Sequence, residues 1–134
     1  MSASFWQVAA APSLDDFAAL AEAAFAGLPA RFRQMAGEVV FRVDDFPADD
    51  VLEDLGLESP FDLTGLYQGA DLASRSVFEA TPPARIFLYR RPILDEWVER
   101  GDVPLGDLIT HVLVHEIGHH FGLSDDEIDR IEAG

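Results

Sequence analysis

The 134-residue sequence contains no cysteine, and this absence limits the chemistry that the chain can carry out. Without cysteine there is no disulfide framework, no thiolate metal ligand and no cysteine nucleophile. A metal site in this chain must therefore be built from the nitrogen and oxygen atoms of histidine, aspartate and glutamate.

Positive charge is scarce. Nine arginines and no lysines stand against 25 acidic residues, which gives a formal net charge of −16. Such a surface repels the phosphates of nucleic acids and of anionic membranes, so neither is expected as a partner. An acidic surface could favour cationic substrates or simply keep the protein soluble, and we favour the second explanation.

Long apolar runs are missing as well. No window approaches the roughly 18 consecutive apolar residues of a membrane span, and the N-terminus lacks the basic region of a signal peptide. We therefore expect a cytoplasmic protein. The length suits a single domain over residues 1–134, in which residues 1–12 need not be ordered.

The first half of the sequence predicts one long helix and one strand. Ser13 is a suitable N-cap for an amphipathic helix that stops between Gly27 and Pro29. The segment 38–46, "EVVFRVDDF", is typical of a mostly buried strand. A short helix is expected over 49–55. Residues 57–84 show no sustained periodic spacing of apolar residues, which predicts a long loop or lid.

The second half predicts a buried strand and three helices. The strand covers 85–90, "RIFLYR", and Pro92 opens a helix that reaches about Glu99. A longer helix begins between Asp102 and Asp107 and runs to about Phe121, with apolar residues around most of its circumference, so it should be largely buried. A last short helix is expected over 125–133.

This buried helix carries the stretch "HEIGHHFGLSD", residues 115–125. Residues four apart on a helix differ by about 40° around the axis and about 6 Å along it, so His115 and His119 can bind one ion. Glu116 is rotated by about 100° from His115, which places its carboxylate beside the ion and within reach of a bound water. This is the position of a general base.

A third ligand can come from the residues that follow the helix. Gly122 suits the left-handed turn that ends a helix, and the returning chain offers Asp125, with Asp126 and Glu127 as alternatives. His111, one turn before His115, is expected to be a packed histidine, although it could also face the site. Gly118 within the helix suggests a close approach by the sheet.

The stretch has the form HExxHxxGxxD, and with it the chain resembles the small bacterial zincin-like metallopeptidase family. The likeness extends to "VVFRVDDFP", "GLYQG" and "RIFLYRRPI" and covers roughly residues 32–132. It implies a compact α+β domain in which a small mixed sheet packs on the buried HExxH helix. It also implies that His115, His119 and Asp125 bind zinc and that Glu116 is the catalytic base.

The resemblance implies hydrolysis of peptide bonds, in peptides or unfolded segments, by a metal-bound water that Glu116 activates. Zinc lowers the pKa of such a water to about 7. An alternative from another class is a metal-stabilised binding or regulatory domain with little or no turnover. Hydrolysis of a non-peptide amide or ester is a third hypothesis. Other divalent transition metals could also occupy a site with two nitrogen ligands and one oxygen ligand.

Overall fold

The computed structural model describes residues 10–69 and 83–133. Its centre is a three-stranded sheet of order β1-β3-β2, with β1 at Val39–Asp44, β2 at Gly65–Gln68 and β3 at Ala84–Tyr89. β3 pairs in parallel with β1 and antiparallel with β2. The sheet is therefore small and mixed, and the predicted α+β class is confirmed.

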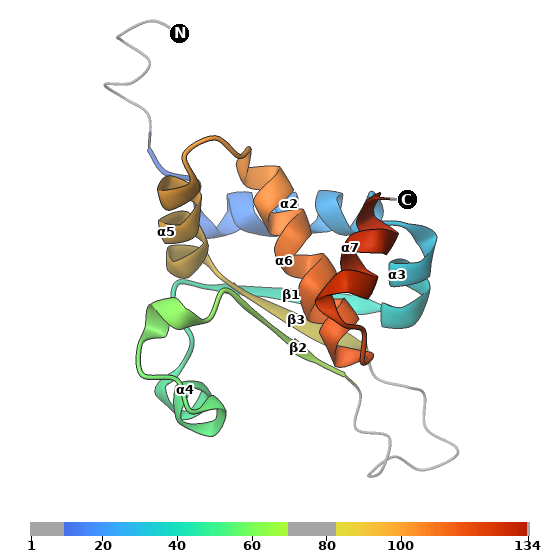
Figure 1. Ribbon diagram of the computed structural model, residues 1–134. Coiled ribbons are helices and arrows are strands. Elements are labelled where there is room, and N and C mark those ends of the chain that lie inside the picture. The colour runs from blue at the N-terminus through green and yellow to red at the C-terminus, as the bar shows by residue number, and fades with distance from the viewer. Residues whose placement is uncertain (1–9, 70–82, 134) are drawn as a thin grey trace, which may run out of the picture.

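The helix α6, at Leu105–His120, crosses one face of the sheet beside α2, at Leu14–Ala26 (Figure 1). It contacts α2 and β2 as well as the helices α3, α5 and α7, and eight of its residues are buried. The predicted burial of this helix is thus confirmed. None of the helices in the described ranges has the combination of length and apolar character that crossing a membrane requires.

The expected N-cap of α2 is present. The Ser13 hydroxyl accepts a hydrogen bond from the Asp16 backbone N–H, and the Asp16 carboxylate accepts one from the Ser13 N–H, which together form a capping box. The helix then buries Phe17 and Ala21 against the core. Local sequence signals therefore place this helix correctly.

The remaining helices lie around this core (Figure 1). The two-turn helix α3, which buries Phe32, was not expected from the sequence. The short helix α4 ends as expected at Gly56, whose φ of 70° is left-handed. The bounds are α3 Ala30–Ala36, α4 Asp49–Leu55, the 3₁₀ helix η1 Pro60–Asp62, α5 Arg90–Arg100 and α7 Asp125–Ala133.

The prediction of a mostly buried first strand is wrong. Along β1, partly buried and exposed residues alternate, and Val40 is 44% exposed. The reason is the position of β1 at an edge of the sheet, where α2 covers only one face. The central strand β3, in contrast, buries Ala84, Ile86, Leu88 and Tyr89.

The prediction of one long loop over 57–84 is also wrong in its first part. This part contains η1 and the edge strand β2, while residues 70–82 lie outside the described residues. β2 is only four residues long and is held by its pairing with β3. A strand this short carries too few residues for a periodic pattern, so its existence depends on its partner.

Candidate metal centre

The end of α6 is a glycine-dependent reversal of the chain. Gly122 has φ of 82°, the Leu123 N–H donates to the Gly118 carbonyl at 2.9 Å, and the Gly122 N–H donates to the His119 carbonyl at 3.0 Å. This pair of hydrogen bonds is the Schellman motif, in which the left-handed residue is usually glycine. The predicted turn at Gly122 is therefore present, and it directs the chain back along α6.

The next helix begins at once and packs against α6. The Ser124 hydroxyl accepts from the Glu127 N–H, and the Glu127 carboxylate accepts from the Ser124 N–H, so α7 starts with a capping box. A Cβ on Gly118 would lie 2.6 Å from the side chain of the buried Ile128. The close neighbour of Gly118 is therefore α7, and the suggestion that the sheet approaches there is wrong.

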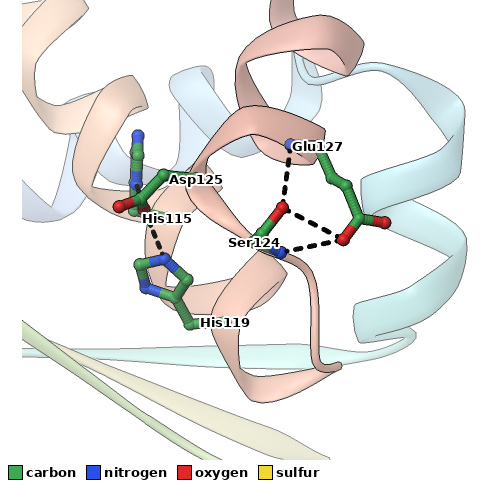
Figure 2. A network of polar contacts seen from close by, with 5 residues as sticks. All are labelled: His115, His119, Ser124, Asp125 and Glu127. Carbon is green, nitrogen blue, oxygen red and sulfur yellow. Dashed lines mark hydrogen bonds and ion pairs between the residues drawn. The ribbon is translucent and has the colours of Figure 1, made fainter.

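This packing brings the three predicted metal ligands together. His119 Nε2 donates to Asp125 Oδ1 at 2.7 Å, and His115 Nδ1 lies 3.5 Å from the same oxygen (Figure 2). One possible ligand atom from each residue lies within 4.8 Å of those of the other two. Glu127, one of the alternatives, is instead occupied by its hydrogen bonds to Ser124.

The three side chains differ in their exposure to solvent. His115 is 21% exposed, His119 50% and Asp125 72%, so the group opens toward solvent on the side of Asp125. The hydrogen bond with His119 is the main reason why the pKa of Asp125 is lowered. Asp125 is therefore a carboxylate at neutral pH, the form that binds a metal ion.

Glu116 lies on the side of α6 that faces β2. A Cβ on Gly65 would lie only 3.4 Å from Glu116 Cγ, and the backbone N–H of Tyr67 donates to the Glu116 carboxylate. Burial raises the pKa of Glu116 to about 7, and the opposing effects of His119 and of the Tyr67 N–H offset only part of this rise. A carboxylate with this pKa can both accept and release a proton near neutral pH.

The donor set fits zinc. Two imidazoles and one carboxylate converge, which is the three-ligand arrangement of catalytic zinc sites, in which the fourth position is left for water or substrate. The exposed side of Asp125 provides such an opening. One hydrogen bond, between His119 and Asp125, and the 3.5 Å contact between His115 and Asp125 hold the three side chains together.

Other polar residues of α6 lie near the centre. The ring of His111 packs against that of His115, with centroids 4.1 Å apart and planes tilted by 50°, and burial lowers the pKa of His111. The ring of His120 packs on the largely buried Tyr67, with the two ring centroids 4.2 Å apart. Glu132, on α7, was not expected near these histidines. It groups with His111 and His115 because α7 packs on α6.

The sequence matches a known protein family over most of its length. Residues 36–134 match the family model described as zincin-like metallopeptidase. Because the match spans most of the chain, the protein belongs to the zincin-like metallopeptidase family. A search of curated proteins finds no match to the chain.

Proposed function

We propose that this protein is a zinc-dependent peptidase in which His115, His119 and Asp125 hold the ion and Glu116 is the catalytic base. The observation that supports the proposal most is the convergence of the three proposed ligands at the end of α6, beside a partly buried carboxylate with a raised pKa. A perturbed carboxylate next to a metal-ligating group is typical of hydrolytic sites.

Zinc and Glu116 have separate roles in the proposed reaction. Zinc, when bound, supplies a Lewis acid that polarises the substrate carbonyl and lowers the pKa of water. Glu116 accepts the proton of the attacking water and passes it to the leaving amine. Its pKa of about 7 suits both steps, because the base is partly ionised at neutral pH and its conjugate acid is strong enough to donate.

The sheet suggests how a substrate would lie. In the described part of the chain, β2 pairs only with β3, so its other edge is available to an extended segment. Strand addition at such an edge uses main-chain hydrogen bonds and requires an extended substrate. We therefore propose peptides or unfolded segments as substrates, which is consistent with a centre that opens to solvent.

The decisive experiment compares wild type with Glu116→Gln in a digest of a broad peptide library. We expect the variant to keep its zinc and to lose hydrolysis by about 10²- to 10⁴-fold, the contribution of a positioned base. Glu99→Gln, which removes the same charge from the exposed end of α5, serves as the control and should retain activity.

Each other outcome has a clear meaning. Hydrolysis at the wild-type rate in Glu116→Gln would refute the role of Glu116 as the base. Loss of zinc in that variant would mean that Glu116 is itself a ligand. Zinc binding without hydrolysis in wild type, across the whole library, would support a metal-stabilised binding domain instead.

A further inference from the structure

His115 belongs to two groups of potential metal ligands. The first is the group with His119 and Asp125. The second consists of His111, His115 and Glu132, whose ligand atoms also lie within 4.8 Å of one another. In the described residues these are the only two such groups, so His115 is the one residue that they share.

The two groups follow from the antiparallel packing of α6 and α7. α7 runs back alongside α6 (Figure 1). Asp125 begins α7 beside His119, a Cβ on Gly118 would meet Ile128, and Glu132 groups with His111 and His115. From His119 to His111 is about 12 Å along a helix axis, and from Asp125 to Glu132 is about 10.5 Å. The interface between α6 and α7 therefore has one group of potential ligands near each end, and His115, which belongs to both groups, lies in the middle.

The two ring nitrogens of His115 point in different directions. Its Nδ1 lies 3.5 Å from Asp125 Oδ1, and Figure 2 shows its other ring nitrogen directed away from Asp125. That nitrogen, Nε2, is buried, and among the described residues it is the one buried side-chain nitrogen or oxygen without a hydrogen-bond partner. A buried polar atom left in this state costs about 1–3 kcal/mol, which binding a metal ion would offset.

We propose that His111, Glu132 and the Nε2 atom of His115 form an alternate zinc site, one turn of α6 before the first. A neutral imidazole has one nitrogen with a free lone pair, since the other carries the proton. His115 can therefore serve one site at a time, and the two positions exclude each other. Zinc at the alternate site would leave only His119 and Asp125 for the first group, on which the proposed hydrolysis depends.

The test measures zinc content and affinity, so its outcome does not depend on whether the protein hydrolyses peptides. Wild type should bind one equivalent of zinc, with an affinity that Glu132→Gln leaves unchanged, because the first site is filled. His119→Gln disables the first site and should still bind one equivalent through the alternate site. In that background, Glu132→Gln should lower the affinity by about tenfold or more, and so should His111→Gln.

Asp129→Asn is the matched control for Glu132→Gln. It removes the same charge from an exposed position of α7 and belongs to neither ligand group, so it should leave the affinity of His119→Gln unchanged. Circular dichroism with a chelator present verifies that each variant is folded.

Three results would overturn the proposal. The first is a His119→Gln variant that is folded but binds no zinc. The second is a residual affinity that Glu132→Gln does not change. The third is an equal loss of affinity on Glu132→Gln in both backgrounds, since this would indicate a structural role for Glu132.

Discussion

Two segments meet the C-terminal half of α6, and they do so in different ways. β2 meets it through buried groups: Gly65 is buried beside Glu116, and Tyr67 is 8% exposed. α7 meets it through the buried Ile128 but presents Asp125 to His119 at the surface, where Asp125 is 72% exposed. β2 therefore lies against the proposed base, and α7 carries the proposed ligand Asp125.

The pKa shifts on the two sides of α6 have different physical causes. On the β2 side, removal from water dominates and raises the pKa of Glu116. On the α7 side, a direct hydrogen bond dominates and lowers the pKa of Asp125. Changes to β2 should therefore affect proton transfer, whereas changes to α7 should affect metal affinity or the stability of the helix pair.

The largest effect is expected for Gly65→Ala on the β2 side. Its Cβ would lie 2.9 Å from Val112 Cγ1 and 3.2 Å from the Phe87 carbonyl oxygen, so Val112 or β2 must shift, and we expect Glu116, whose Cγ it contacts at 3.4 Å, to shift with them. A displacement of about 1 Å in a catalytic group can cost about 10²-fold in rate. We expect kcat/KM to fall by about that factor while zinc content stays the same. Loss of zinc together with activity would show that β2 also supports the ligands.

Gly106→Ala is the control for that experiment. Gly106 also lies on α6, but a Cβ there meets no atom within 4 Å, and its φ is not left-handed. The substitution should leave kcat/KM unchanged. A similar loss of activity in Gly106→Ala would mean that α6 tolerates no change, and the effect of Gly65→Ala would then say nothing about β2.

The next effect concerns Asp125 on the α7 side. Asp125→Ala removes the proposed carboxylate ligand and should weaken zinc affinity by about tenfold or more, the scale reached even when groups around the ligands are lost. Asp126→Ala should leave the affinity nearly unchanged, because Asp126 belongs to neither ligand group. Zinc titrations of both variants test this, and a larger loss in Asp126→Ala would identify Asp126 as the ligand.

These predictions also show how far the sequence can be interpreted. The α7 side was predictable because its signals are local: glycine at 122 ends a helix, and Asp125 follows His119 by six residues. The β2 side was not, since β2 exists through its pairing with β3, far along the chain. Sequence spacing therefore indicated Glu116 as the candidate base, but not the burial that raises its pKa.

The same limit explains the missed Glu132. It follows Asp125 by seven residues, and nothing in that spacing links it to His111. The link appears only when α7 packs antiparallel on α6. Gly118 is a similar case, because the residue indicated a close contact while its neighbour, Ile128, depended on the tertiary packing.

A smaller effect, on stability alone, is expected for Gly118→Ala. An alanine in a helix is favoured over glycine by about 1 kcal/mol, so Gly106→Ala should raise the melting temperature. At Gly118 the new Cβ would lie 2.6 Å from two carbons of Ile128, and such overpacking costs about 1–3 kcal/mol. We expect a lower melting temperature, and no further decrease when Gly118→Ala is added to Ile128→Ala. Independent effects of the two substitutions would contradict this contact.

The smallest effect is expected for Ser124→Ala, which removes the N-cap of α7. The Ser124 hydroxyl accepts the Glu127 N–H at 3.2 Å, and loss of such a cap costs about 1 kcal/mol. Because α7 carries both Asp125 and Glu132, fraying of its first turn should also weaken zinc binding, but less than Asp125→Ala does. Thermal unfolding and zinc titration, with Asp126→Ala as the control, measure the two effects together. If Ser124→Ala weakened zinc binding as much as Asp125→Ala, the position of the α7 N-terminus, rather than the Asp125 carboxylate itself, would determine the affinity.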